Sequence, residues 1–250
     1  MSDQNDGVDR RSIRIDADVE QVWAAWAEPE HVKRWFSDDA HGTVEPGEEL
    51  VHTFEGHGEH RYKVIEVEAP HRLVLEGRMM GGEAFRQEVR ITREAGTTIL
   101  ELVHSGFGPM DPDDETAQGI DSGWTMALTV LKHYVENYFG RDKTTVAIFR
   151  PARFDYDGLA TQHYFSAEGR SSWLGPVAES LGGELARTDH EVCFRFRDKD
   201  GVLELKAFGS SPEQRFLGVR GISWSGDDAV GNSLTPDLTQ AVDRLLQALN

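Results

Sequence analysis

The stretch "VWAAWAEPEHVKRWF", residues 22–36, places three tryptophans and a phenylalanine within a chain that is otherwise rich in acidic and polar residues. Val19, Trp23 and Trp26 recur at helical spacing, which predicts a helix with one apolar face. Pro29 ends this helix and begins a second short one, because proline suits a first turn but not a helix interior. Rings of this size need a large apolar surface to cover, so we expect the two helices to seal one end of a sheet.

The segments on either side of this stretch predict strands. The segment "RRSIRIDAD", residues 10–18, alternates apolar and polar residues before the helices. Further alternating segments follow them, at residues 48–56, 60–70, 71–81, 84–95 and 97–107. The breaks between these segments are short and rich in Gly, which predicts an antiparallel meander with one apolar face.

The segment "GIDSGWTMALTVLKHYVENYFG", residues 119–140, predicts a long amphipathic helix that Gly140 ends. A strongly curved sheet leaves its concave face open, so the long helix is expected to lie across that face. The predicted order is therefore a strand, two short helices, a curled antiparallel sheet and a closing helix.

The second half of the chain repeats this order in shorter form. A strand is predicted near residues 146–149 and a helix near 159–164, and Trp173 with Leu174 is expected to take the place of Trp35 with Phe36. The closing helix is expected to have Thr235 as its N-cap and Pro236 in its first turn. The predicted domains are a disordered tail at 1–9, a first domain at 10–140 and a degenerate second copy at 141–250. The alternative is that residues 141–250 form an appendage packed on the first domain.

Charge and cysteine content narrow the classes of partner. The net charge is −18, and residues 1–140 hold 13 Lys and Arg against 28 Asp and Glu. Such a surface repels phosphate backbones and anionic lipids, so we expect neither a nucleic-acid nor a membrane partner. The single cysteine, Cys193, cannot form an internal disulfide, which favours a cytoplasmic location. Composition leaves the oligomeric state open.

Two motifs together resemble a known superfamily. "IDADVEQVWAAWAEPEHVKRWF" (15–36) and "GIDSGWTMALTVLKHY" (119–134) resemble the SRPBCC (START/Bet v 1-like) superfamily and, within it, the AHSA1 group, named for the activator of Hsp90 ATPase. The resemblance implies an α+β helix-grip fold for residues 10–140, in which a curved antiparallel sheet wraps a long C-terminal helix above an apolar cavity. Members bind lipids, sterols, polyketides or other small hydrophobic molecules, a few are cyclases, and the namesake is a co-chaperone.

The expected site is the cavity between the sheet and the long helix, since ligand pockets are mostly apolar with a few polar groups. The residues expected to line it are Trp26, Phe36, His52, Phe54, Met79, Phe85, His104, Phe107, Trp124 and Leu128. Each of these residues alone also suits plain core packing, and the set is the stronger argument. We expect no metal and no cofactor, because the spacing of His52, His57 and His60 matches no metal-binding motif.

Three functions fit these observations. The first is the binding of a small hydrophobic ligand, with His52 or His104 orienting its polar end. The second is a co-chaperone of the Hsp90 type with a role in the stress response, whose partner would be a chaperone. The third is a cyclase-like or hydratase-like enzyme that uses His104. We favour binding over catalysis, because sequence spacing assigns His104 no carboxylate partner and thus gives no catalytic set.

Overall fold

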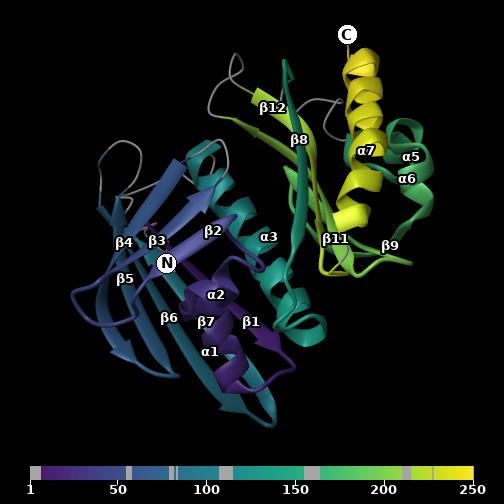
Figure 1. Ribbon diagram of the computed structural model, residues 1–250. Helices are drawn as coiled ribbons and strands as arrows, with labels where there is room; N and C mark the ends of the chain where they lie inside the picture. Colours follow the sequence, from purple (N-terminus) through teal and green to yellow (C-terminus); the bar gives the residue numbers. More distant parts are fainter. Residues whose placement is uncertain are drawn as a thin grey trace. The chain divides into compact units, whose positions relative to one another are not determined.

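The computed structural model describes residues 7–54, 58–78, 82, 84–106, 115–154, 164–209, 215–226 and 228–249. The chain divides into two compact units (Figure 1). Unit 1 comprises Met1–Ala117 and Val130–Gly140, and unit 2 comprises Gln118–Thr129 and Arg141–Asn250. Helix α3 (Glu115–Asn137) therefore contributes residues to both units. None of the described helices is long and apolar enough to span a bilayer.

Unit 1 is built on a seven-stranded antiparallel sheet with the order β1-β7-β6-β5-β4-β3-β2. Its elements are β1 (Val8–Ile15), α1 (Val19–Ala27), α2 (Pro29–Val32), β2 (Asp39–Gly42), β3 (Glu49–Phe54), β4 (Gly58–Glu68), β5 (Arg72–Arg78), β6 (Ala84–Glu94) and β7 (Thr97–Ser105). The predicted meander is confirmed. Strand β2 was not predicted, because its four residues are too few to show a period. Strand β1 starts inside the predicted tail, because Val8 and Asp9 pair with Ser105 and His104 of β7.

The two short helices follow the signals that predicted them. Asp18 precedes α1, and its backbone N–H donates to Oε1 of Gln21 at 3.2 Å, which satisfies one free amide of the first turn. Pro29 occupies the first turn of α2. The indole N–H of Trp35 donates to the carbonyl of Ala25 at 2.7 Å in a buried position, so this side chain ties the segment after α2 back to α1.

The C-terminal half of α3 packs in unit 1. Val130, Leu131 and Tyr134 are buried there. The hydroxyl of Tyr134 accepts from the N–H of Gly140 at 3.1 Å and lies 3.0 Å from Nδ1 of His31, so it joins the end of the helix to α2. The helix begins at Glu115, earlier than the segment predicted for it.

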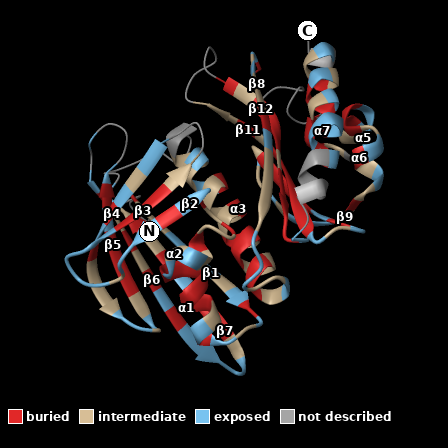
Figure 2. Cartoon of the chain, in the orientation of Figure 1, coloured by how far each residue is buried: buried red, intermediate tan, exposed pale blue. Residues whose placement is uncertain are grey.

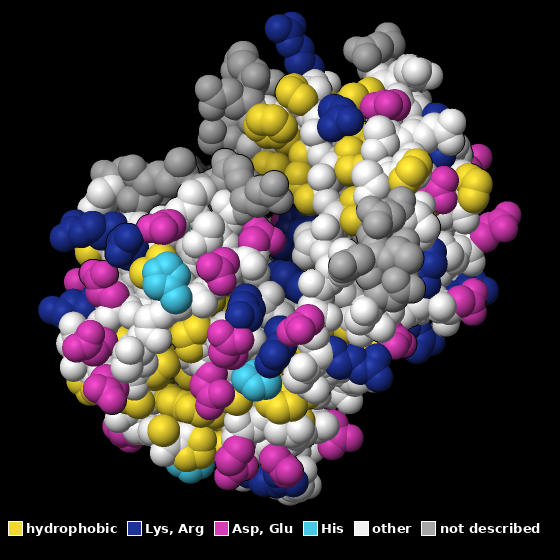
Figure 3. All heavy atoms as spheres, viewed as in Figure 1, with side chains coloured by type: hydrophobic (Ala, Val, Ile, Leu, Met, Phe, Trp, Pro, Cys, Tyr) yellow, Lys and Arg dark blue, Asp and Glu magenta, His cyan; other side chains and the backbone are white. Residues whose placement is uncertain are grey.

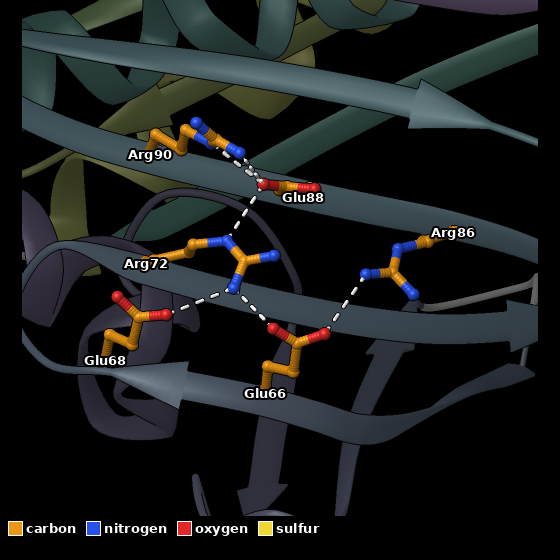
Figure 4. Close-up of polar contacts among 6 residues, drawn as sticks. All are labelled: Glu66, Glu68, Arg72, Arg86, Glu88 and Arg90. Carbon is orange, nitrogen blue, oxygen red and sulfur yellow. Dashed lines mark hydrogen bonds and ion pairs between the residues drawn. The ribbon is translucent and has the colours of Figure 1, made fainter.

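The outer face of the unit 1 sheet carries a network of charged side chains (Figure 4). Its members are Glu66, Glu68, Arg72, Arg86, Glu88 and Arg90, from β4, β5 and β6. Arg72 is the centre of the network: it contacts Glu66, lies 3.2 Å from Glu68 and lies 2.9 Å from Glu88. Hydrogen bonds from Arg72 hold the pKa of both Glu66 and Glu88 below its usual range. The network links three strands on the solvent side, which leaves the opposite face for the core.

Unit 2 repeats the topology of unit 1 with fewer strands. Its elements are β8 (Thr144–Ala152), α5 (Ala167–Leu174), α6 (Pro176–Glu179), β9 (Leu181–Arg187), β10 (Glu191–Phe196), β11 (Gly201–Gly209), β12 (Arg215–Ser223) and α7 (Asp228–Leu249). The sheet order is β8-β12-β11-β10-β9. In both sheets the first strand pairs with the last, and two short helices follow the first strand. The α+β helix-grip fold with a shortened second copy is therefore confirmed.

Two details of unit 2 differ from the sequence predictions. Helix α7 begins at Asp228, so Pro236 lies inside the helix and not in its first turn. The proline removes one backbone hydrogen bond from the helix. The helix nevertheless continues past it, and Leu234 and Leu238 on either side of the proline are both buried. Trp173 stands three residues before the proline that starts α6, which is the position of Trp26 before Pro29, so it corresponds to Trp26 and not to Trp35. The predicted helix near 159–164 lies almost wholly outside the described residues.

The core of unit 2 lies between its sheet and α7. Buried residues line the strands and the inner side of α7 in Figure 2. Leu238, Val242 and Leu245 of α7 pack in one cluster with Phe194 and Leu205 of the sheet. The ring of Tyr164 stacks on Trp173 with centroids 4.9 Å apart, and its hydroxyl donates to the carbonyl of Gly218 at 2.6 Å. The buried hydroxyl of Tyr164 therefore has its hydrogen-bond partner within this core.

The opposite face of the unit 2 sheet holds a buried ion pair. Glu204 of β11 has no exposed surface and pairs with Arg220 of β12. Burial alone would raise the pKa of Glu204, but Arg220 and Lys206 outweigh it and hold the pKa below its usual range. Cys193 stands opposite Glu204 in the sheet, and burial raises the pKa of its thiol, which disfavours the reactive thiolate.

Candidate functional site

The inner face of the unit 1 sheet carries a continuous group of rings, which we call the aromatic–histidine cluster. It consists of Trp26, Trp35, Phe36, His52, Phe54, His60, Tyr62, Phe85 and His104. The strands place these rings together by register: His52 pairs with His60 between β3 and β4, and Tyr62 and Phe85 each pair with Gly77 of β5. Residues of the first helices and of four strands thus meet on one surface.

The rings of the cluster touch one another in sequence from the helices to β7. Trp35 lies 5.9 Å from Trp26 and 5.0 Å from Phe36, measured between ring centroids. Phe36 contacts His52 at 5.9 Å and Phe54 at 5.2 Å. The path continues from His52 to Tyr62 at 4.9 Å, from Tyr62 to Phe85 at 6.0 Å and from Phe85 to His104 at 4.9 Å.

Two histidines of the cluster are buried in a neutral state at pH 7. His52 is 8% exposed and His104 is 7% exposed. Burial lowers the pKa of each to about 4, and His60 adds to the effect on the pKa of His52. Among the described residues, the buried Nδ1 of His52 has no hydrogen-bond partner. Buried polar atoms in native proteins are normally bonded to protein or water, so this nitrogen is a candidate contact for a ligand.

Further polar groups flank the histidines on the same face. Gln87 of β6 is 7% exposed and stands directly opposite His104 of β7. Asp9 of β1 stands opposite His104 on its other side, and Nε of Arg11 donates to both carboxylate oxygens of Asp9 at 3.0 and 2.9 Å. Sequence reasoning missed Asp9 and Gln87, because only the strand order brings them beside His104.

The structure brings six of the ten predicted site residues together in the cluster. These are Trp26, Phe36, His52, Phe54, Phe85 and His104. Trp35, His60 and Tyr62 complete the cluster and were not predicted, although the alternation of β4 would have placed His60 and Tyr62 beside His52. Trp124 and Leu128 belong to the part of α3 that groups with unit 2. Met79 and Phe107 lie outside the described residues. The role of all ten in binding stays a prediction.

Gly77 gives a direct test of how the cluster is packed. A methyl group added there would clash with Cζ of Phe85, so the ring lies over the glycine. We expect Gly77→Ala to displace the ring of Phe85 and to lower the free energy of unfolding by about 1–3 kcal/mol, as overpacking does. Urea denaturation measures this loss, and Phe85→Leu in the same chain should restore part of it.

The matched control is Gly123→Ala, because a methyl group there meets no atom within 4 Å. It should leave stability unchanged or raise it slightly, as alanine does in a helix. If Gly77→Ala is as stable as the unmodified chain, the ring of Phe85 does not lie over Gly77.

Metal binding finds no support at the described positions. The described part of the chain contains no group of three or more His, Cys, Asp or Glu side chains placed to hold an ion. His52 and His60 lie opposite each other in the sheet, and His57 lies outside the described residues. The groups that this surface presents are apolar rings, the buried histidines and the paired side chains of Asp9 and Arg11.

Comparison with known proteins gives a family match and structural neighbours. Residues 16–136 match the family described as Activator of Hsp90 ATPase homolog 1-like protein. The Aha1 dimer from Colwellia psychrerythraea is 18% identical with a TM-score of 0.47, over 53% of this chain and 98% of that one. CalU16 from Micromonospora echinospora is 24% identical with a TM-score of 0.43, over 53% of this chain and 85% of the CalU16 chain. DynU16, from the dynemicin biosynthetic locus, is 19% identical with a TM-score of 0.46, over 97% of both chains. No curated protein matches the chain.

Proposed function

Because residues 16–136 form a domain of the Activator of Hsp90 ATPase homolog 1-like family, we propose that this domain binds a small hydrophobic molecule over the aromatic–histidine cluster. The observation that carries the proposal is the buried Nδ1 of His52, which has no hydrogen-bond partner among the described residues and lies among aromatic rings. A buried polar atom without a partner costs free energy, and a ligand that bonds to it recovers that cost.

Unit 2 differs from unit 1 at the corresponding surface. Its sheet presents Phe194, Phe196, Leu203, Leu205 and Leu217 to α7, and these pack in one apolar cluster that contains no histidine among its described members. The contrast supports one ligand for each chain, held by unit 1, with unit 2 as a copy whose interior is filled by side chains.

The electrostatics of the cluster support binding over catalysis. A general base works best when its pKa lies near the working pH. The pKa of His52 and of His104 is about 4, because burial penalises the charged imidazolium. At pH 7 both rings are weak bases, and they serve better as neutral hydrogen-bonding groups that orient a ligand.

The family description also supports a second candidate, a co-chaperone of Hsp90. The strong negative charge of residues 1–140 suits a basic partner surface. Acidic side chains lie among basic ones over the face of unit 1 seen in Figure 3. The rate of ATP hydrolysis by a purified Hsp90, measured with and without this chain at low and high salt, distinguishes this candidate from ligand binding alone.

The neutral fluorescent probe N-phenyl-1-naphthylamine tests the binding proposal. We expect the chain to bind it with a stoichiometry of one, and Phe54→Ala to weaken binding roughly tenfold, since truncating a ring removes apolar contact worth about 1–2 kcal/mol. Phe54 is partly exposed, so its truncation should leave the fold intact.

The matched control is Phe149→Ala on β8 of unit 2, a second partly exposed phenylalanine on a strand. It should leave probe binding unchanged. Equal losses in both variants, or no binding by the unmodified chain, would overturn the proposal.

A further inference from the structure

We propose that the ligand of unit 1 is an uncharged, flat aromatic molecule that carries a hydrogen-bonding hydroxyl group, and not a fatty acid or another aliphatic lipid. This inference rests on the proposed binding function and adds the chemical class of the ligand. It follows from the shape of the ring contacts, the charge balance of the inner face and the buried Nδ1 of His52, which has no hydrogen-bond partner among the described residues.

The ring contacts favour a flat aromatic ligand. Four pairs in the cluster meet almost at right angles: Phe36 with Phe54 at 90°, Phe54 with His60 at 89°, Phe85 with His104 at 86° and Phe36 with His52 at 83°. Such edge-to-face contacts present ring faces and ring edges in turn, and both kinds of surface prefer another aromatic ring. An aliphatic chain would gain apolar burial here but none of this directional preference.

The charge balance of the inner face disfavours a carboxylate or a phosphate. At the inner-face positions of the described strands of unit 1, the two cations are already paired. Arg11 bonds to Asp9, and Arg93 bonds to Asp18 at 2.7 Å. The buried histidines are neutral at pH 7 and supply no positive charge. A charged ligand would thus lose its hydration without gaining a counter-ion, which is costly.

The polar atoms of the cluster favour a hydroxyl group. The buried Nδ1 of His52 has no hydrogen-bond partner among the described residues. The ring of Tyr62 lies 4.9 Å from that of His52, measured between centroids, so a second polar side chain is next to this nitrogen. A hydroxyl both donates and accepts, and it can bond to a neutral imidazole in either tautomer.

Four probes of similar size separate the possible chemistries: 2-naphthol, naphthalene, 2-naphthoate and 1-decanol. Isothermal titration calorimetry at pH 7.5 measures the affinity of each for the full chain. We expect 2-naphthol to bind at least tenfold more tightly than 2-naphthoate and 1-decanol. We expect His52→Phe, which keeps a ring and removes the nitrogen atoms, to weaken 2-naphthol about tenfold, the effect of one lost hydrogen bond. The same variant should leave naphthalene unchanged.

The control variant is His41→Phe, because His41 is exposed on β2 and faces away from the cluster. It should change none of the four affinities. Tighter binding of 2-naphthoate or 1-decanol would overturn the aromatic, uncharged class while leaving hydrophobic binding in place. An equal loss of 2-naphthol and naphthalene in His52→Phe would overturn the assigned hydrogen bond. If none of the four probes binds, the proposed function itself is wrong.

Discussion

The Arg220→Met variant is expected to lower the free energy of unfolding of unit 2 by about 3–5 kcal/mol, the usual cost of removing one partner from a buried ion pair. Glu204 has no exposed surface, and its carboxylate would remain in the sheet without Arg220. Burial would then raise the pKa of Glu204, and the carboxylate would need a proton in order to stay buried. Urea denaturation measures the loss, and hydrogen exchange of the amides of β11 and β12 assigns it to unit 2.

Two further variants separate the charge effect from a packing effect. Replacing both partners, Glu204→Met with Arg220→Met, should recover most of the lost stability, because two apolar side chains leave no buried charge. Arg141→Met removes an exposed pair with Asp200 and should cost at most about 1 kcal/mol. If the double variant is as unstable as Arg220→Met, packing and not charge explains the loss.

Mild acid is expected to destabilise unit 1 through His52 and His104. The pKa of each is about 4 in the folded chain, against the ordinary value of 6.5. Between these two values the unfolded chain binds more protons, so stability is complete above pH 6.5 and is lost as the pH falls toward 4. From pH 7 to pH 5 we expect a loss of about 2 kcal/mol for each histidine.

Urea denaturation at pH 7 and pH 5 checks this prediction, and His52→Phe and His104→Phe should each remove about half of the difference. The comparison stops at pH 5 because ordinary carboxyl groups titrate below it. His41→Phe again serves as the control, since its side chain is exposed. Equal stability at pH 7 and pH 5 in the unmodified chain would contradict the burial of the two imidazoles.

The sequence predicted the elements of unit 1 because their signals are local. The helical spacing of Val19, Trp23 and Trp26, and the position of Pro29, depend on neighbours within a few residues. Strand β2 escaped prediction because four residues carry no period. The start of α7 was predicted wrongly because a proline usually marks the first turn of a helix. In the structure the helix runs through Pro236, and the leucines on either side of it are buried.

The candidate site was predicted in part, and the missing residues share one physical reason. Phe85 and His104 were found because they lie on apolar faces of their own strands. Asp9 and Gln87 flank His104 only because β7 lies between β1 and β6, and this strand order does not follow from any single segment. The pairing of Arg11 with Asp9, which neutralises charge on the inner face, could not be predicted from the sequence for the same reason.

Helix α3 has a consequence for how the two units can be separated. Residues 118–129 belong to unit 2 and residues 130–140 to unit 1, although helix α3 (Glu115–Asn137) runs through the boundary between them. No single break in the polypeptide therefore releases both copies whole: a fragment ending at Gly140 takes with it a segment of its neighbour. A cut in this junction therefore leaves at least one of the two compact units incomplete.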